Sequence, residues 1–473
     1  MAKKSIYFVS LGCPKNRVDS EVMIGVAKGA GYRLVDAPED AQAIVVNTCG
    51  FIGEAKKESI DTIFELAELK RSGALKKLVV AGCLSQRYPD ELSREMPEVD
   101  HFLGSSDMLR LKDVLSGDEE ERMLVGNPAD WVVRASDPRV ITGPRASAYV
   151  KIAEGCNRSC AFCTIPQFRG KQRSRPIDDV VREVEQLAAA GTKEVNLISH
   201  DTIAYGRDLR GERELPKEER TKLAALVRRV AEVPGIRWVR IFYLYPETMD
   251  DELVELIASH PRVVRYVDMP LQHASDAMLK RMKRGHGIDR QRRVVERLRN
   301  AIPDLVFRTA FIVGHPGETD ADFGELTAFV EWARFEHMGV FRYSDEETCK
   351  SFLMDEKVPV GVAGARYRKL MSVQRKIARA RNKARVGSTL EVLVEGVSEE
   401  HEFVMKGRHA GQAPDIDGQV YLSGGEARAG EMRRVRISQS SDYDLVGELV
   451  EEEVSAATKK AAPKKKVGLR VVP

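Results

Sequence analysis

The first hundred residues alternate short apolar segments, rich in β-branched residues, with longer segments of helical periodicity. The apolar segments at 5–12, 43–48 and 77–82 read SIYFVSLG, AIVVNT and KLVVAG, and helical patterns such as ESIDTIFELAELK lie between them. Strands that alternate with helices are typical of a parallel sheet covered on both faces. The pattern therefore predicts a doubly wound α/β domain, which we place at residues 4–116.

The segment that follows this domain has no such alternation. It begins with GDEEER and continues through a stretch that contains proline and glycine. Clustered charges together with turn-forming residues are typical of solvated connections. We therefore expect residues 117–144 to be a linker.

A second alternation begins at Ala148 and contains six strand-like segments. Two of its helical segments are bounded by clear signals: DDVVREVEQLAAAG has an acidic first turn and a terminal glycine, and DDELVELIASHP is stopped by proline. The strand-like segments are AYVKIAE, EVNLIS, VRIFYLY, VVRYVDM, FRTAFIV and MGVFRY. Six successive βα units predict a partial (β/α)6 barrel over residues 145–380.

The remainder of the chain changes character twice. Short β-like runs with glycine turns from 381 to 453 predict a small all-β barrel of the OB-like type. The last residues, 454–473, are basic and of low complexity, and they contain too few apolar residues to pack, so we expect a disordered tail.

Composition narrows the class of protein. Of the 473 residues 43% are hydrophobic and 31% charged, and no apolar run reaches the roughly 18 to 20 residues that span a bilayer. The apolar run near the N-terminus is short and lacks a cleavage site, which predicts a cytoplasmic protein. Seven cysteines are an odd number for a disulfide framework, and thiolate ligands to a metal are favoured instead.

Three of the cysteines form a CxxxCxxC motif directly after the first predicted barrel strand. In GCNRSCAFC, Cys156, Cys160 and Cys163 lie in a loop on the face that carries catalytic residues in β/α barrels. Three thiolates leave one iron of a four-iron cluster open to a substrate or cofactor. The alternative is zinc, but structural zinc normally has four ligands, and no fourth cysteine or histidine lies nearby.

Three further cysteines each follow a predicted strand of the N-terminal domain. Cys13, Cys49 and Cys83 are 36 and 34 residues apart, about one βα unit each. Equivalent positions in a parallel sheet bring them to one carboxyl edge, where ligands bind. Taken singly, each is more readily explained as a buried core cysteine. Cys349 has no partner at cluster spacing, and we treat it as an ordinary residue.

Several stretches carry a resemblance to a known family over residues 4–450. They are LGCPKNRVDSE, VVNTCGFI, GCNRSCAFCTIPQFRG, LISHDTIAYG, YVDMPLQHAS, FIVGHPGET and SDYDLVGE. Together they resemble the methylthiotransferase family of radical S-adenosylmethionine enzymes. The resemblance implies an N-terminal methylthiotransferase domain, a radical S-adenosylmethionine barrel and a C-terminal TRAM barrel.

The same resemblance implies two [4Fe-4S] clusters, with S-adenosylmethionine as both methyl donor and radical source. The radical abstracts hydrogen from an unactivated carbon, while the protein shields it. On this resemblance the first cluster is held by Cys156, Cys160 and Cys163 and the second by Cys13, Cys49 and Cys83.

The contacts of S-adenosylmethionine are a further expectation. The resemblance places Phe162 against the adenine. Ser199, Asp201, Gln272 and His273 fall at strand ends on the catalytic face and can hold the ribose or methionine part of the cofactor. The segment 314–318 occupies a similar place. Turn formation or helix capping is the alternative explanation of these residues.

Two branches of the family act on different substrates. LGCPKN is similar to the RimO-like branch, which modifies an aspartate of a small-subunit ribosomal protein, whereas the MiaB-like branch, with a GCQMN-like motif, modifies an adenosine in transfer RNA. From Val386 to Glu453 there are fifteen Asp or Glu and six Lys or Arg residues, a net charge of −9, which disfavours RNA and favours a basic ribosomal protein.

Other features weigh against this prediction. Nine Lys or Arg residues at 365–385 and the basic tail would suit RNA contact. His200 and His315 replace the Gln and Phe that are usual in the RimO-like branch, which affects the expected cofactor pocket. A non-catalytic iron-sulfur protein that binds RNA is a second alternative. The expected partners are a basic ribosomal protein, free or on the small subunit, and an electron donor of the flavodoxin or ferredoxin type. We expect the enzyme itself to be a monomer.

Overall fold

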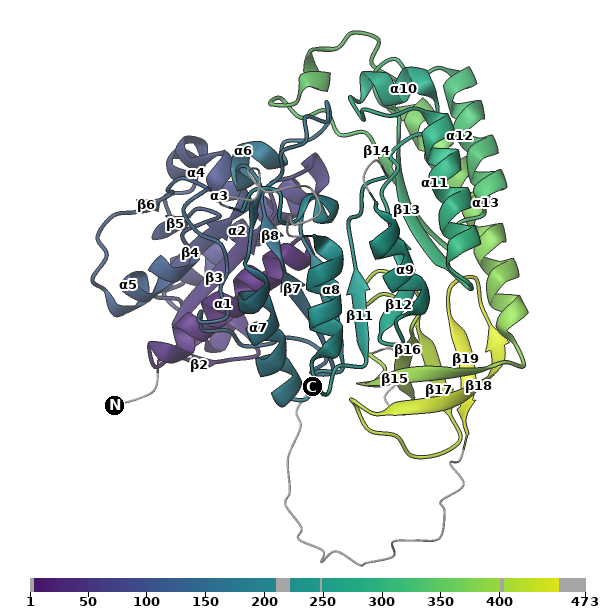
Figure 1. The fold of residues 1–473 in the computed structure, drawn as a ribbon. Coiled ribbons are helices and arrows are strands. Elements are labelled where there is room, and N and C mark those ends of the chain that lie inside the picture. The colour runs from purple at the N-terminus through teal and green to yellow at the C-terminus, as the bar shows by residue number, and fades with distance from the viewer. Residues whose placement is uncertain (1–3, 210–221, 247–248, 400–403, 451–473) are drawn as a thin grey trace, which may run out of the picture.

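The computed structural model describes residues 4–209, 222–246, 249–399 and 404–450. The expected basic tail at 454–473 lies outside these residues. Figure 1 shows an N-terminal α/β unit beside a central barrel, with a small β-barrel at one end of the latter. Within the described ranges, no helix is both long enough and apolar enough to cross a membrane.

The N-terminal unit is a six-stranded parallel sheet in the order β2-β1-β3-β4-β5-β6. Its strands are β1 (Ser5–Ser10), β2 (Arg33–Leu34), β3 (Ala43–Thr48), β4 (Lys77–Gly82), β5 (His101–Leu103) and β6 (Met123–Leu124). Its helices are α1 (Pro14–Gly29), α2 (Gly53–Arg71), α3 (Cys83–Arg87), α4 (Pro89–Glu95) and α5 (Leu111–Ser116), with short 3-10 turns η1 (Pro38–Asp40) and η2 (Met108–Arg110).

Both faces of this sheet are buried, as continuous apolar strands require. In β3, Val45 packs with Met23 of α1 and Leu111 of α5, while Ile44 packs on the opposite face with Ile63 of α2. All six residues of β3 are buried. The predicted doubly wound parallel sheet is confirmed.

The segment expected to be a linker also contributes to this sheet. Met123 and Leu124 form β6, which pairs in parallel with Phe102 and Leu103 of β5. Leu124 is fully buried. The N-terminal unit therefore extends past residue 116, because this two-residue edge strand is too short to show a period in the sequence.

The central unit is an open six-stranded parallel sheet in the order β14-β13-β12-β11-β10-β7. Its strands are β7 (Ser147–Lys151), β10 (Glu194–Ile198), β11 (Trp238–Ile241), β12 (Val263–Asp268), β13 (Val306–Val313) and β14 (His337–Arg342), and β8 (Ala153–Glu154) pairs separately with β9 (Arg173–Ser174).

Helices cover the outside of this sheet. They are α6 (Ile165–Arg169), α7 (Ile177–Ala189), α8 (Leu223–Glu232), α9 (Asp251–Ser259), α10 (Asp276–Arg281), α11 (Ile288–Ala301), α12 (Asp320–Ala333) and α13 (Val360–Arg385), with 3-10 turns η3 (Thr202–Ala204) and η4 (Lys350–Leu353). The partial barrel is confirmed. The third predicted strand, 239–245, is shorter than expected: β11 ends at Ile241, and Tyr243 adopts a positive φ of 58°.

The C-terminal unit is a closed antiparallel and parallel barrel in the order β15-β16-β17-β19-β18. Its strands are β15 (Thr389–Val397), β16 (Met405–His409), β17 (Val420–Ser423), β18 (Met432–Ser440) and β19 (Leu445–Leu449). The predicted small all-β barrel is confirmed. Helix α13 runs on to Arg385, beyond the boundary that we expected at residue 380.

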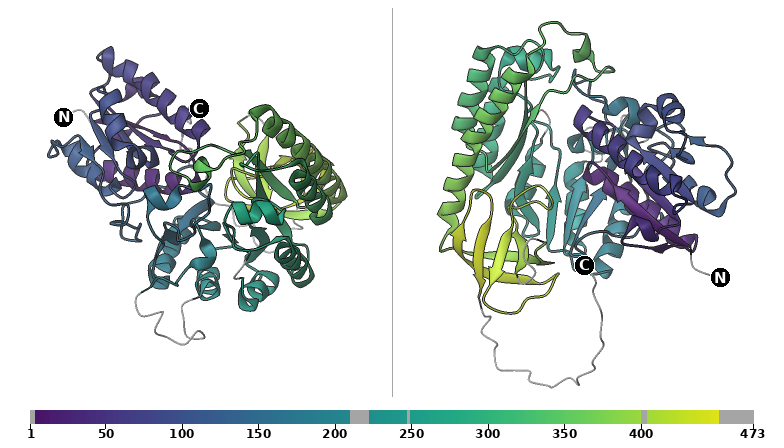
Figure 2. Two further views of the ribbon diagram at one scale, coloured as in Figure 1. Left: turned by 90° about the horizontal axis from the view of Figure 1, so that it is seen from above. Right: turned by 180° about the vertical axis from the view of Figure 1, so that it is seen from behind.

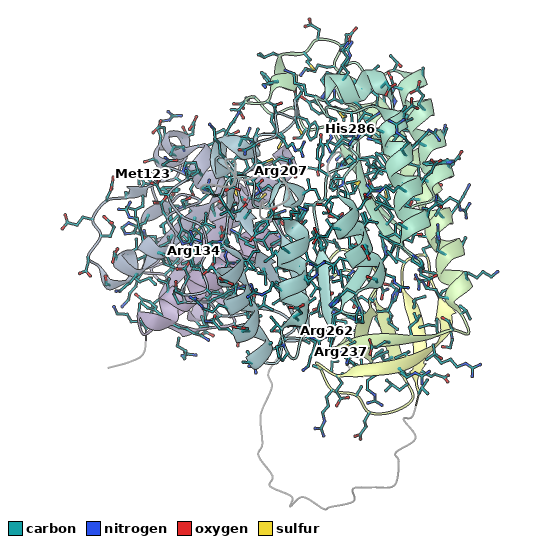
Figure 3. The ribbon with its side chains drawn as sticks, in the orientation of Figure 1. Met123, Arg134, Arg207, Arg237, Arg262 and His286 are labelled. Atoms are coloured by element: carbon teal, nitrogen blue, oxygen red, sulfur yellow. The ribbon has the colours of Figure 1, made fainter. Side chains whose placement is uncertain are left out.

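The small barrel covers the amino ends of the central strands. Glu194, the first residue of β10, accepts hydrogen bonds from Arg240 of β11 (2.9 Å) and Arg408 of β16 (2.5 Å). Figure 3 shows Arg237 and Arg262, which precede β11 and β12, beside the small barrel, and His286 toward the other end. The carboxyl ends of the strands, where the cysteine loop lies, are therefore remote from the small barrel.

The N-terminal unit packs against the open edge of the central barrel. Helix α1 lies along β7, and Arg17 of α1 stacks 5.8 Å from the ring centroid of Tyr149 in β7. The view from above shows the two units side by side (Figure 2, left). This arrangement brings the carboxyl edges of the two sheets together.

Candidate functional site

The loop that carries Cys156, Cys160 and Cys163 joins β8 to α6. The backbone holds it from three sides: Cys156 N donates to Gly170 O (3.1 Å), Ala161 N donates to Met282 O (3.0 Å), and Ala161 O accepts from Ser351 N (3.0 Å). The loop is therefore fixed by segments that follow β12 and β14.

A glycine is required just before this motif. Gly155 has a φ of 76°, and a Cβ there would lie 2.2 Å from the carbonyl oxygen of Lys171. Only glycine combines this backbone conformation with so close an approach. The backbone conformation and the lack of space for a side chain therefore require the glycine of the GCNRSC motif.

The thiols of this loop are partly to fully shielded from solvent. Burial raises the pKa of Cys156 to about 11 and also raises the pKa of Cys163. Hydrogen bonds reach the sulfurs from Arg158 N to Cys156 Sγ (3.4 Å) and from Arg284 Nη1 to Cys160 Sγ (3.3 Å). Thiols with raised pKa values stay protonated when no metal is present, but they ionise to thiolates when they bind a cationic metal core. This set of donors therefore fits an iron-sulfur cluster.

The second triplet lies at the carboxyl ends of three neighbouring strands. Cys13 caps α1 after β1, Cys49 follows β3, and Cys83 begins α3 after β4. Glycines allow them to approach: a Cβ at Gly12 would lie 3.1 Å from Cys49 Sγ, and one at Gly50 would lie 2.8 Å from Cys83 O. These close approaches place the ends of β1, β3 and β4 side by side, whereas a common metal cluster on the three thiols stays a prediction.

The ionisation of these thiols is coupled. Burial, and then the neighbouring thiols of Cys83 and Cys13, raise the pKa of Cys49 to about 12. Burial also raises the pKa of Cys83, which Arg169 opposes. A cationic core would relieve the mutual repulsion, as it would in the first triplet.

Arg169, which the sequence did not single out, connects the two triplets. It lies in α6, six residues after Cys163, and its side chain is 1% exposed. Its Nε and Nη2 lie 3.2 and 3.0 Å from Cys83 Sγ. Its Nη1 donates to Asp19 of α1 (2.9 Å). The loop of the first triplet therefore supplies the cation that faces the second.

A buried ion network surrounds Arg169. Lys151 Nζ donates to Asp19 (2.5 Å) and to Glu154 (2.6 Å), and all three side chains are at most 4% exposed. Despite burial, Lys151 and Arg169 hold the pKa of Glu154 well below its usual range. The network fixes β7 and β8 of the central barrel to α1 of the N-terminal unit.

The expected cofactor contacts all lie at the carboxyl end of the barrel. Ser199 is fully buried, and its hydroxyl is 3.0 Å from that of Thr202. Asp201 accepts from Arg158 Nε at 2.6 Å, and its buried Oδ1 has no hydrogen-bond partner among the described residues. Gln272 has a positive φ of 72°, and Phe162 is partly exposed in the cysteine loop.

The other expected residues of this face are mostly engaged with one another. His273 Nε2 lies 3.2 Å from Glu318 Oε1, and Arg366 donates to the same carboxylate (3.0 Å). His315 is fully buried, its Nε2 finds no partner in the part of the chain that the structure describes, and burial lowers the pKa of this imidazole to about 4. Buried acceptors without partners, such as Asp201 Oδ1 and His315 Nε2, fit a site that a polar cofactor completes.

The remaining sequence features are placed as follows. His200 packs 3.4 Å from Glu154, and burial lowers the pKa of its imidazole well below the usual value. Cys349 is 4% exposed, and it lies near Cys163. Among the described residues, no three His, Cys, Asp or Glu side chains converge as ligands of a single metal ion.

Comparison with known proteins agrees with this geometry. The radical SAM superfamily model matches residues 150–330, the Uncharacterized protein family UPF0004 matches residues 5–104, and the TRAM domain matches residues 386–450. The radical SAM match assigns S-adenosylmethionine and a [4Fe-4S] cluster as cofactors.

Relatives of known name cover the whole chain. The ribosomal protein uS12 methylthiotransferase RimO of Sorangium cellulosum is 67% identical over 100% of this chain and 98% of its own. The RimO of Myxococcus xanthus is 51% identical over 95% of this chain and 92% of its own.

Among solved structures, the radical S-adenosylmethionine methyltransferase TsrM of Kitasatospora setae is similar in fold. Its form with tryptophan and a cofactor analogue bound has a TM-score of 0.55 and 12% identity, over 80% of this chain and 89% of its own. With a likeness in fold, three domain matches and relatives matched along their full length, the chain belongs to the RimO-type methylthiotransferase family of radical S-adenosylmethionine enzymes.

Proposed function

We propose that this methylthiotransferase adds a methylthio group to the β-carbon of an aspartyl residue in ribosomal protein uS12. The observation that carries the proposal is the contact of Arg169, six residues after Cys163 of the first triplet, with Cys83 of the second. The relatives that are 67% and 51% identical bear the name of a uS12 methylthiotransferase.

Two [4Fe-4S] clusters are part of the proposal. Cys156, Cys160 and Cys163 would hold one, and Cys13, Cys49 and Cys83 the other. Together with S-adenosylmethionine they supply a radical that abstracts hydrogen, and a methylated sulfur that replaces it. Phe162, Ser199, Asp201 and Gln272 would line the cofactor.

The protein's own residues shield and position this chemistry. Asp201 is held by Arg158, whose guanidinium also lies 3.6 Å from the ring centroid of Tyr245. Arg169 and Lys151 tie α1 to the barrel, so that the second triplet cannot move independently of the first. No side chain need act as a general base, because hydrogen leaves the substrate as an atom.

The structure also bears on the alternative of transfer RNA. The arginines of α13 are largely engaged: Arg379 pairs with Asp442 (2.6 Å), and Arg381 pairs with Glu336 (2.9 Å). Four of the nine Lys or Arg side chains of this helix have ion pairs among the described residues, and the adjoining small barrel is acidic, which would repel a phosphate backbone. The acidic barrel favours a basic protein as substrate.

The electron donor is proposed to dock over the first triplet. Ala161 in that loop is hydrogen-bonded to the turn at Met282 and to Ser351. Lys280 and Lys350 are exposed on these flanking segments. Such a surface suits an acidic flavodoxin or ferredoxin.

We further propose that the enzyme acts as a monomer in the cytoplasm, where the ribosomal substrate resides.

Anaerobic turnover tests the substrate directly. The reconstituted enzyme would be incubated with S-adenosylmethionine, a reductant and either uS12 or unmodified transfer RNA, and both products would be examined by mass spectrometry. We expect methylthiolated uS12 and unmodified RNA. Methylthiolated RNA with unmodified uS12 would overturn the proposal, and absence of 5′-deoxyadenosine would instead indicate a non-catalytic iron-sulfur protein.

A further inference from the structure

Lys15 is a buried cation beside the second triplet. It lies in α1, two residues after Cys13, and its side chain is 6% exposed. Its Nζ is 3.1 Å from the ring centroid of Tyr243. Within the part of the chain that the structure describes, no hydrogen bond or ion pair reaches this ammonium group. A cation–π contact alone does not replace the hydration that burial removes.

The buried charges nearest to Lys15 are balanced without it. Lys151 and Arg169 share Asp19 and Glu154, so this network contains two cations and two anions. Both carboxylates already accept charge-assisted hydrogen bonds. Lys15 is therefore a positive charge at the junction of the two units that these carboxylates do not neutralise.

The carboxylate on the barrel side is also already engaged. Asp268, at the end of β12, accepts from Arg308 Nη1 (2.8 Å) through one oxygen and from Tyr243 N (3.0 Å) through the other. Arg308, which also lies 3.7 Å from Asp417, is the ion-pair partner of Asp268, and no described ion pair joins Asp268 to Lys15. A buried ammonium without an anion costs free energy that an anionic ligand would recover.

The position of Lys15 indicates which ligand this is. Cys13 lies on one side, and Tyr243, which follows β11 at the carboxyl end of the barrel, lies on the other. An anion bound to Lys15 would therefore lie between Cys13 of the second triplet and the carboxyl end of the barrel, the end that carries the loop of the first triplet. In an aspartyl side chain the carboxylate is bonded directly to the β-carbon, so one ion pair would also fix the reacting carbon.

We propose that Lys15 is the counter-ion that receives the carboxylate of the substrate aspartyl side chain between the two cysteine triplets. This inference rests on the proposed function. The ion pair selects for a negatively charged residue and against an uncharged nucleobase, which gives the ammonium no anion. Lys15 is then a determinant of specificity that acts through charge.

Binding measurements on the reconstituted full chain, without reductant, separate this role from turnover. The probes are uS12 and a uS12 variant whose modified aspartate, located by mass spectrometry, is changed to asparagine. For Lys15→Met we expect roughly 30-fold weaker binding of native uS12 and no change for the asparagine variant. Lys15→Arg should restore the preference for aspartate in part. Lys28→Met, at the exposed end of the same helix, serves as the matched control and should bind as the wild type does.

Four results would overturn the inference in distinguishable ways. If Lys15→Met weakened both uS12 forms equally, the lysine would have a structural role. If it weakened S-adenosylmethionine binding alone, the lysine would hold the methionine carboxylate. If it changed only the iron content or the potential of the second cluster, the lysine would balance the thiolates. If the wild type did not bind uS12 at all, the proposed function itself would fail.

Discussion

Replacing Glu194 by glutamine would remove the buried negative charge that joins the central barrel to the small β-barrel. Glu194 is fully buried and accepts from Arg240 and Arg408, whose side chains are at most 2% exposed. Glutamine keeps the shape and one acceptor, but it leaves Arg240 without its carboxylate partner and Arg408 with Glu395 alone (2.7 Å). The variant therefore measures the contribution of the negative charge separately from that of side-chain shape.

Two independent arguments give the size of the effect. Removing one partner of a buried ion pair costs about 3–5 kcal/mol. Burial alone would raise the pKa of Glu194, but Arg408 and Arg240 lower it from 4.5 to about 2. At 1.36 kcal/mol per unit of pKa, this shift contributes about 3 kcal/mol to the free energy of unfolding. We expect a loss of about 3 kcal/mol in the variant.

The sign of the pH dependence follows from the lowered pKa. The contribution of Glu194 is complete above its unfolded pKa of 4.5 and is lost as the pH falls from there toward 2. The difference between wild type and Glu194→Gln should therefore shrink from about pH 6 to about pH 3. Urea unfolding would be followed by Trp238, which is 5% exposed in the junction with Leu393, after Trp131 and Trp332 are changed to phenylalanine.

An exposed pair at the same junction provides the control. Glu391 pairs with Arg237 (3.0 Å), and their side chains are 46% and 55% exposed. Glu391→Gln should cost less than about 0.5 kcal/mol. Equal urea midpoints for the Glu194 and Glu391 variants would refute the reasoning and the placement of the small barrel.

Three further outcomes are expected. Cys160→Ala should abolish cleavage of S-adenosylmethionine, whereas Cys49→Ala should allow cleavage but not sulfur transfer, as measured by 5′-deoxyadenosine and product mass; full methylthiolation by Cys49→Ala would show that this cysteine holds no second cluster. Arg169→Gln should keep the first cluster and make the reduction potential of the second cluster more negative, because a cation and two hydrogen-bond donors to sulfur are lost. An electrochemical titration would measure the potential, and an unchanged value would contradict this role of Arg169. Charge reversal at Lys280 and Lys350 should slow turnover with flavodoxin but not with dithionite, and equal rates with both reductants would exclude the proposed docking surface.

Much of the architecture was predictable because the spacing of apolar residues that marks a strand or a helix lies within a short segment of sequence. The segment 43–48 was expected as a strand, and β3 spans Ala43–Thr48. The motif of Cys156 was predictable too, because its spacing lies within one loop. The two-residue strand β6 and the early end of β11 at Ile241 were not predictable, because neither produces a periodic pattern of apolar residues in the sequence.

The site itself was only partly accessible from the sequence. The equivalence of parallel strand ends was enough to predict that Cys13, Cys49 and Cys83 follow neighbouring strands at one edge of the sheet. Arg169 and Lys15 could not be singled out, because their roles depend on side chains that are distant in sequence and meet only when the two units pack. The only local signals were the family-like stretches that contain these residues, QFRG for Arg169 and GCPKN for Lys15.

The most direct test of the two-triplet site is the iron and acid-labile sulfide content of the reconstituted full chain. We expect about eight irons per chain, and about four in a variant whose Cys13, Cys49 and Cys83 are all alanine, since each triplet would hold one four-iron cluster. About four irons in the wild type, unchanged in that variant, would contradict a second cluster.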